Sequence, residues 1–372
     1  MRILGIETSC DETSVAVVED GRRVLSNVIA SSRKEQEAYG GVFPECAARR
    51  QLECIVPAVD QALKRAKVAP NDLDAIAVTK GPGLLPSLLV GAIAARSLAS
   101  VWKKPLIGVH HNLGHLVSPW LECEEEPEFP ILSLSVSGGH TELWLRKSHT
   151  RGTLLGRTLD DAAGEAFDKG ATLLGLPYPG GPALSALAKD GDPKSIKFPT
   201  MLAGKDPLSF SFAGLKTSLK YLLRDAGGLH ALTESEKKNI AASFQEAICT
   251  HLLSRLKNAM ELHTEVKEVH LVGGVSANTR LREGLKELVL CHAERRADML
   301  DSSSAFANAR SAQNDRVGPK TKHRTRTRIP ARIEYCTDNA AMIAAAAEFL
   351  LQDRGKEAYG VFKTEASLAL AL

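Results

Sequence analysis

The sequence predicts an α/β protein built from two similar halves that face each other across a cleft. Two observations support this fold class. Short apolar strands alternate with helical patterns along the chain, which favours helices packed on mixed sheets. Residues 2–19 and 131–145 each contain a strand, a turn of small and polar residues, and a returning strand. Because ligands of α/β proteins bind in such crevices, both hairpin turns are expected to point towards a binding site.

The first half is expected to contain a hairpin followed by alternating helices and strands. Asp20-Gly21 predicts a hairpin turn between two of the strands. Pro44 suits the first position of a helix, because its φ is fixed and it has no N–H group to satisfy. The predicted strands are 2–6, 15–19, 24–29, 75–78 and 106–109, and the predicted helices are 44–66 and 84–102.

The second half repeats this pattern without repeating the sequence. The predicted strands are 131–136, 141–145 and 269–272. The predicted helices are 161–174, 213–223 and 234–262, one that starts at Ser276, and a last one that starts near Thr337. The halves are therefore related by the order of their elements.

The expected division places residues 1–121 in a first domain, 122–128 in an acidic linker, 129–353 in a second domain and 354–372 in a tail. The acidic run is interpreted as a solvated loop. An insertion at 298–330 has no apolar period and contains most of the eight Lys and Arg residues found between Arg310 and Arg332. It is expected to be a disordered surface loop, with contact to RNA phosphates as the less favoured interpretation.

The composition is typical of a soluble globular protein. The 372 residues are 44% hydrophobic and 24% charged, and the formal net charge is +3. Seven scattered cysteines without a C-x-x-C pair argue against a disulfide framework or a cysteine zinc site. The longest apolar stretches, such as 84–95, are shorter than the ~18 residues of a membrane span. These features predict a cytoplasmic protein that does not bind a membrane.

His111 and His115 form the sharpest local motif. On a helix this spacing places both imidazoles on one face, as a metal ion requires, although two ordinary helix histidines would look the same. Asn112 follows the first histidine where metallopeptidases have a glutamate base, which argues against peptide hydrolysis. Asp338 is a candidate third ligand, with a plain helix N-cap as its alternative role. Two histidines and one carboxylate suit iron or zinc.

Several turns are candidates for anion binding or acid–base chemistry. Ser137-Gly138-Gly139-His140-Thr141 follows an apolar strand, and its glycines let the backbone approach a phosphate. Residues 272–278 place a strand, Gly-Gly and a helix start in order, which suits a nucleotide. Asp11 and Glu12 lie in the first hairpin turn, and Asp168 lies within an apolar helix pattern. Each of these features is also common in turns and helices without any ligand.

Seven motifs taken together are more specific than any one of them. They are residues 5–13, 39–42, 81–84, 111–115, 137–141, 273–278 and 336–339. This set, in this order, resembles the TsaD family of tRNA N6-adenosine threonylcarbamoyltransferases, formerly described as glycoprotein endopeptidases. The resemblance extends from Met1 to about Leu351, apart from the basic insertion. It implies two tandem actin-like, RNase H-like domains of the sugar kinase–actin ATPase superfamily around a nucleotide cleft.

The resemblance also implies a reaction and a set of site residues. The family transfers threonylcarbamoyl from threonylcarbamoyl-AMP to N6 of the adenosine next to the anticodon in tRNAs that read ANN codons. One divalent ion, iron or zinc, is implied at His111, His115 and Asp338, and ATP or AMP can occupy the cleft. Substrate binding is implied for Ser135, Val136, Ser137, Gly138, Gly139, Asp168, Gly181 and Asn278. Asp11 is implied as the catalytic acidic residue.

The same resemblance implies partners, and it shows two positions at which this sequence differs from the family. It implies tRNA, with TsaB-like and TsaE-like proteins if the chain is bacterial or a homodimer if it is mitochondrial. Gln36 and Gln51 stand where the family usually has histidines. Three other functions remain open on the residues alone: a metallopeptidase, an ATP-dependent kinase or chaperone-like ATPase of the same fold, and a nucleotide-binding scaffold.

Overall fold

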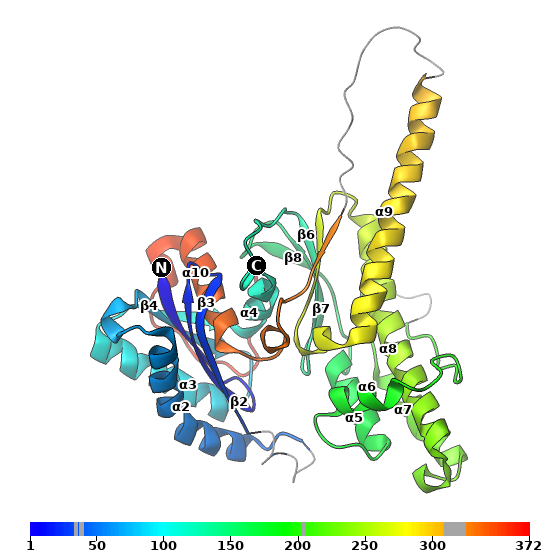
Figure 1. Ribbon diagram of the computed structural model, residues 1–372, viewed down its shortest axis with the longest axis horizontal. Helices are drawn as coiled ribbons and strands as arrows, with labels where there is room; N and C mark the ends of the chain where they lie inside the picture. Colours follow the sequence, from blue (N-terminus) through cyan, green and yellow to red (C-terminus); the bar gives the residue numbers. More distant parts are fainter. Residues whose placement is uncertain (33–35, 37–40, 203–205, 309–324) are drawn as a thin grey trace.

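The computed structural model describes residues 1–32, 36, 41–202, 206–308 and 325–372. Within these residues the strands form two five-stranded sheets, ordered β3-β2-β1-β4-β5 and β10-β9-β6-β7-β8 (Figure 1). The strands are β1 Arg2–Glu7, β2 Glu12–Glu19, β3 Arg23–Ser31, β4 Ala75–Gly81, β5 Leu106–His110, β6 Ile131–Val136, β7 Thr141–Arg146, β8 Gly152–Arg157, β9 Glu268–Val272 and β10 Arg326–Arg328.

The two sheets have the same topology. In each, the first three strands form an antiparallel meander, and the last two run parallel to its first strand. The order of elements in the second half therefore reproduces that of the first, strand by strand. The predicted repeat is confirmed, and β8 and β10 are additions to the predicted strands.

Helices cover the sheets and connect the parallel strands. The α-helices are α2 Pro44–Ala66, α3 Leu85–Trp102, α4 His111–Val117, α5 Ala163–Leu173, α6 Gly180–Ala188, α7 Ala213–Asp225, α8 Glu234–Leu262, α9 Thr279–Asn308 and α10 Ala340–Arg354. Short 3-10 helices are η1 Pro70–Asp72, η2 Ser118–Trp120, η3 Leu229–Ala231, η4 Gly274–Ala277, η5 Ile333–Tyr335 and η6 Gly355–Ala358.

The first sheet is buried on both faces. Successive strand residues point to opposite sides, so Leu4 and Ile6 pack under α2 and α3, whereas Ile3 packs under α10. By length and hydropathy α3 would suffice to cross a membrane, but it packs on β4 as a covering helix. Gly5 permits α10 to lie close to β1, because a Cβ there would come within 2.3 Å of the Ala340 carbonyl oxygen.

The second sheet is covered on one face by α5, α6, α7 and α8, which enclose the larger core (Figure 1). Leu132 and Leu134 of β6 point into this core, where Phe167, Leu219 and Phe244 meet them. On the opposite face Trp144 of β7 packs with Leu116 of α4. The short helix α4 therefore contacts both halves of the molecule.

The position of α10 differs from the division expected from the sequence. That division put residues 129–353 in the second domain, yet α10 packs against β1, β2 and β4 of the first sheet. Its alanine-rich sequence explains why, since small side chains let a helix fit closely against a sheet. The segment 354–372 also packs on the first half: Phe362 lies against Gly108, and Tyr359 bridges to Ile107.

The expectation of a disordered insertion at 298–330 is wrong at both of its ends. Helix α9 continues to Asn308, and β10 pairs in parallel with β9. Residues 309–324 lie outside the described residues. Arg328 of β10 forms ion pairs with buried Glu268 at 3.2 Å and with Glu125 at 3.3 Å, which explains why this part of the basic segment is ordered.

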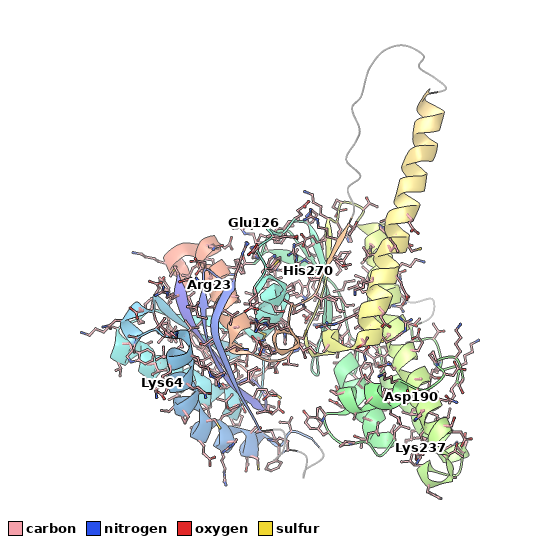
Figure 2. All side chains as sticks on the ribbon, in the orientation of Figure 1. Arg23, Lys64, Glu126, Asp190, Lys237 and His270 are labelled. Carbon is pink, nitrogen blue, oxygen red and sulfur yellow. The ribbon has the colours of Figure 1, made fainter. Side chains whose placement is uncertain are left out.

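The acidic linker forms ion pairs as well as facing solvent. Glu128 pairs with Arg326 at 3.2 Å, and Glu126 pairs with Arg22 at 2.7 Å. In Figure 2 Glu126 lies at the edge of the molecule, whereas His270 lies within the second half. The linker therefore joins the β2–β3 turn to the edge of the second sheet by charge pairing.

Candidate active site

Two histidines and an aspartate meet at the start of α4. The imidazoles of His111 and His115 lie one helical turn apart, with ring centroids 4.7 Å from each other at an interplanar angle of 84°. Asp338, just before α10, places its Oδ1 3.5 Å from His111 Nε2 and 3.3 Å from His115 Nε2. One ligand atom from each residue lies within 4.8 Å of the others.

Asp338 is not the N-cap of α10. The cap is Asn339, whose side-chain oxygen accepts a hydrogen bond from the Met342 N–H at 3.0 Å. The Asp338 carboxylate therefore turns towards the two imidazoles. Of the two roles open for this aspartate on the sequence, the structure contradicts the cap, and the ligand role stays a prediction.

Glu7 at the end of β1 contacts His111 on the side of the ring opposite Asp338. Its Oε2 lies 3.0 Å from His111 Nδ1 and accepts a hydrogen bond from Thr79 Oγ1 at 2.6 Å. Burial by itself lowers the pKa of His111, but the charges of Asp338 and Glu7 outweigh it and raise the pKa to about 9. A metal that binds at Nε2 displaces the proton there, and the carboxylate on Nδ1 holds the tautomer that this requires.

The site suits a divalent ion. Within the described residues, neither ring nitrogen of buried His115 makes a hydrogen bond, and the nearest charged group is the Asp338 carboxylate, 3.3 Å from Nε2. Leaving such groups without a partner is costly in a protein interior, and a metal ion relieves that cost. Two imidazoles and one carboxylate are ligands typical of zinc or iron sites.

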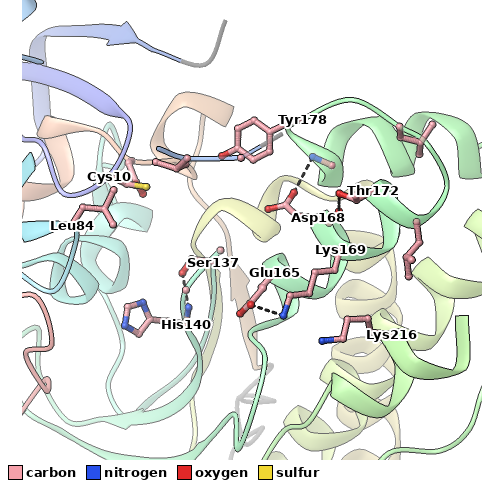
Figure 3. A pocket seen from close by; sticks show the side chains of 18 of the residues that line it. Cys10, Leu84, Ser137, His140, Glu165, Asp168, Lys169, Thr172, Tyr178 and Lys216 are labelled. Carbon is pink, nitrogen blue, oxygen red and sulfur yellow. Dashed lines mark hydrogen bonds and ion pairs between the residues drawn. The ribbon is translucent and has the colours of Figure 1, made fainter. Parts of the chain in front are cut away.

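The cluster opens onto a cavity of about 1220 Å³ between the two halves. Cys10 and Leu84 approach this cavity from the first half, and Asp168, Lys169 and Lys216 approach it from the second (Figure 3). The lining comprises Ser9, Cys10, Gly41, Val42, Pro82, Gly83, Leu84, His111, Ser137, Gly138, Gly139, His140, Glu165, Asp168, Lys169, Thr172, Leu173, Leu176, Pro177, Tyr178, Gly180, Lys216, Thr217, Lys220, Tyr221 and Asp338.

Half of the residues predicted for the site line this cavity. They are His111, Ser137, Gly138, Gly139, Asp168 and Asp338. His115 is buried behind the lining and belongs to the metal cluster. Ser135, Val136, Gly181, Asn278 and Asp11 do not line the cavity. Asp11 is 7% exposed beside cavity-lining Cys10, immediately before β2.

Asp168 and Asn278 have clear structural roles. Asp168 Oδ1 accepts the N–H groups of Gly180 at 2.9 Å and Gly181 at 3.3 Å, at the start of α6. Burial raises the pKa of Asp168 although these bonds oppose the shift. Asn278 caps α9 through the Leu281 N–H at 3.0 Å, and its amide nitrogen donates to Gln245 at 2.8 Å.

Two glutamines, Gln36 and Gln51, hold the turns around the cavity. Gln51 Nε2 donates to the carbonyl oxygens of Cys10 at 3.0 Å and Glu12 at 3.1 Å, which ties α2 to the first hairpin turn. Gln36 Oε1 accepts the Phe43 N–H at 2.8 Å. At position 51 the two donor hydrogens of one amide nitrogen satisfy two carbonyl groups.

Sequence reasoning missed the wall formed by α5 and α7. Glu165 and Lys169 on α5, and Lys216 and Lys220 on α7, repeat at four-residue intervals and so share a face of their helix. This four-residue spacing of charged residues could have predicted from the sequence that they share one face of each helix. His140, at the end of the Gly-Gly turn, also lines the cavity; burial lowers its pKa to about 4, with the nearby His111 and His115 contributing.

Comparison with known proteins places the chain in a family. The TsaD family model, described as tRNA N6-adenosine threonylcarbamoyltransferase, matches residues 23–345. The protein of that name from Anaeromyxobacter dehalogenans strain 2CP-1 is 46% identical over 358 residues, which are 96% of each chain. The one from Symbiobacterium thermophilum is 46% identical over 348 residues, covering 94% of this chain and 91% of the relative.

A solved structure supports the fold. Full-length HypF, in its phosphate- and nucleotide-bound form, has a TM-score of 0.56 at 13% identity, covering 94% of this chain and 46% of that chain. The expected fold, with two actin-like domains of mixed sheets and covering helices, is confirmed. The family match over most of the sequence and the identity to both relatives show that this chain belongs to the TsaD family of tRNA N6-adenosine threonylcarbamoyltransferases.

Proposed function

We propose that this chain transfers the threonylcarbamoyl group from threonylcarbamoyl-AMP to N6 of the adenosine next to the anticodon in tRNAs that read ANN codons. The observation that carries the proposal is the cluster of His111, His115 and Asp338 at the inner wall of a cavity between two actin-like halves, in a member of the TsaD family.

The three clustered side chains would hold one divalent ion, iron or zinc. Such an ion supplies Lewis-acid polarisation of a donor oxygen when bound. Glu7 keeps a proton of His111 on Nδ1, on the side away from Asp338. Asp338 Oδ1 lies near Nε2 of the same ring, where the ion would bind. These residues therefore prepare a site of defined charge and orientation before the donor arrives.

The Ser137–Gly139 turn is the proposed binding site for the donor phosphate. Gly138 and Gly139 both line the cavity, and open space lies where a Cβ would stand at each of them. A phosphate can therefore approach the backbone N–H groups there without a side chain in the way. The same pocket would admit ATP or AMP. Ser135, Val136, Asp168, Gly181 and Asn278 would act around it, the last by shaping the start of α9.

The acceptor amine needs help from the protein. An adenine N6 amine is a poor nucleophile because its lone pair is delocalised into the ring, whereas a mixed anhydride with AMP has a good leaving group. Asp11, beside cavity-lining Cys10, is the proposed group that orients or deprotonates the amine. An Asp11→Asn variant that transfers at the full rate would remove Asp11 from this role.

The other activities have less support. A metallopeptidase would need a base next to His111, but Asn112 stands there and its amide donates to the Glu142 carboxylate at 3.3 Å. A kinase or ATPase of the same fold predicts ATP turnover without tRNA. Casein hydrolysis blocked by a chelator would favour the peptidase, and steady ATP turnover without tRNA would favour the ATPase.

The protein partners are proposed from the family and from one apolar surface. TsaB-like and TsaE-like proteins are the expected partners in a bacterial cytoplasm, in keeping with the bacterial relatives, and a homodimer is expected in a mitochondrion. Helices α2 and α3 expose Leu52 at 63%, Val56 at 72% and Ile93 at 58%. Apolar residues gathered on a surface commonly mark a protein interface. Ile93→Glu is expected to weaken association with a TsaB-like protein in a pull-down.

The decisive experiment is transfer of radiolabelled threonylcarbamoyl from its adenylate to unmodified ANN-decoding tRNA, with and without candidate partners. Label is expected in tRNA with the unchanged chain and not with His115→Ala. Elemental analysis of the purified protein identifies the metal. Absence of transfer under every partner combination would refute the proposed function.

A further inference from the structure

Helix α7 presents a distinct surface beside the cavity. Its inner row, Leu215, Leu219 and Leu223, is buried in the core of the second half. The neighbouring row, Lys216, Lys220 and Arg224, places one cation on each helical turn. Thr217 and Tyr221 form a second row beside the cations. We call Lys216, Thr217, Lys220, Tyr221 and Arg224 the α7 surface.

The α7 surface runs from the cavity wall to solvent. Its first four members line the cavity, and Lys216 reaches towards it from α7 (Figure 3). The Lys216 side chain is 34% exposed, whereas Arg224 in the same row is 67% exposed. A chain that enters the cavity along this helix would therefore pass the cations in sequence.

Acidic residues neutralise part of this row but not all of it. Lys216 pairs with Asp161 at 3.2 Å, and Arg224 pairs with Asp225 at 2.7 Å. In the described part of the chain, Lys220 has neither an ion pair nor a hydrogen bond, and it lies on the exposed side of α7. Its ammonium group is the one most available to an external phosphate.

Tyr221 adds an aromatic face next to these charges. The residue is 51% exposed, so its ring is accessible from solvent. The Arg224 guanidinium carbon lies 4.8 Å from the centre of the ring. Exposed aromatic rings beside cations are typical of surfaces that stack single-stranded bases and contact their phosphates.

We propose that the α7 surface binds the single-stranded anticodon loop of the substrate tRNA, with a base stacked on Tyr221 and a phosphate at Lys220. This inference rests on the proposed function, because that function requires a loop adenosine to reach the cavity. The volume of about 1220 Å³ exceeds the roughly 300–1,000 Å³ typical of a small-molecule pocket, so donor and acceptor base have room together.

The stacking contact is tested by fluorescence anisotropy with a labelled anticodon stem-loop RNA of an ANN-decoding tRNA and the full chain. Tyr221→Ala is expected to weaken binding about 5- to 150-fold, the range of one lost base–aromatic stack. Tyr221→Phe keeps the ring and is expected to bind within about twofold of the unchanged protein. Since Tyr221 lies on the surface, circular dichroism should show equal folding of the variants.

The phosphate contact is tested by the salt dependence of the same binding. Lys220→Gln is expected to reduce the slope of log K against log salt by about 0.7, the value for one phosphate contact of a single strand. Lys257→Gln is the matched control, because Lys257 on α8 is also partly exposed, at 42%, and lies outside the cavity lining. It is expected to leave the slope unchanged.

The outcomes separate this inference from the proposed function. Unchanged RNA binding by both Tyr221→Ala and Lys220→Gln would overturn the α7 surface as an RNA contact, as would a failure of the unchanged chain to bind the RNA. Loss of association with a protein partner, with RNA binding intact, would make it a protein interface instead. Tyr221-dependent binding, with no threonylcarbamoyl transfer under any partner combination, would refute the transferase and leave the RNA surface standing.

Discussion

Replacing Glu7 with glutamine tests how the metal cluster is organised. The Glu7 carboxylate is fully buried and accepts hydrogen bonds from Thr79 Oγ1 and the Ser9 N–H, with His111 Nδ1 at 3.0 Å. Glutamine has nearly the same shape, but one of its two acceptor positions becomes an NH2 donor. The variant must therefore either present a donor to one of these groups or lose one of the bonds.

The expected loss of metal affinity follows from the tautomer of His111. If the amide nitrogen of the new glutamine faces His111, it donates a hydrogen bond, and His111 Nδ1 must accept it. The imidazole proton then moves to Nε2, which is the ring atom that faces Asp338. Removing such a supporting carboxylate typically costs 10- to 100-fold in metal affinity, or about 1.4–2.7 kcal/mol. Glu7→Gln is therefore expected to weaken zinc binding by about that factor.

The assay is competition for zinc between the protein and a chromophoric chelator, with circular dichroism to confirm folding. Thr79→Val is the matched control, because it removes one hydrogen bond to the same carboxylate and leaves that carboxylate on His111. Its metal affinity is expected to stay within a few-fold of the unchanged protein. Equal zinc affinity of Glu7→Gln and the unchanged chain would refute the tautomer argument.

Three further predictions follow from described contacts. Asn339→Ala is expected to destabilise the fold by about 0.5–2 kcal/mol and to keep the metal affinity. Asp338→Asn is expected to weaken metal binding and to keep the stability of the fold. Thermal denaturation measures the first effect, and metal titration measures the second. Burial lowers the pKa of His270 to about 4, so the unfolded chain binds its proton first, and His270 should contribute about 2 kcal/mol to the fall in stability between pH 7.5 and pH 5 in urea denaturation. A His270→Gln variant that keeps the same pH dependence would contradict this. Deleting residues 361–372 is expected to lower the melting temperature, because the Ala366 carbonyl no longer accepts the Gly83 N–H; an unchanged value would show that the tail is not structural.

The repeat of the two halves was visible in the sequence because strand and turn signals are local. Alternation between two sheet faces and the Asp20-Gly21 turn depend on neighbours only a few residues away. The pairing of β10 with β9 was not visible in this way. Strand β10 has three residues, and ion pairs to Glu268 and the acidic linker hold it in place.

Long-range packing also decided which candidates meet at the site. The spacing of His111 and His115 fixed their shared face as soon as that segment was helical. Whether Asp338 joined them depended on Asn339 taking the cap and on α10 packing across to the first sheet. Asn278 had the same kind of motif evidence, yet it caps α9 away from the cavity.

The sequence by itself determined the α/β class, the repeated hairpins, the histidine pair and the family, because these depend on residue types at short, fixed spacings. The tertiary structure decided that a late aspartate and an early glutamate flank that pair, and that the lysines and tyrosine of α7 line the same cavity. These contacts join residues that lie tens to hundreds of positions apart. Spacing along the chain cannot specify them, because they depend on how the two sheets and their covering helices pack.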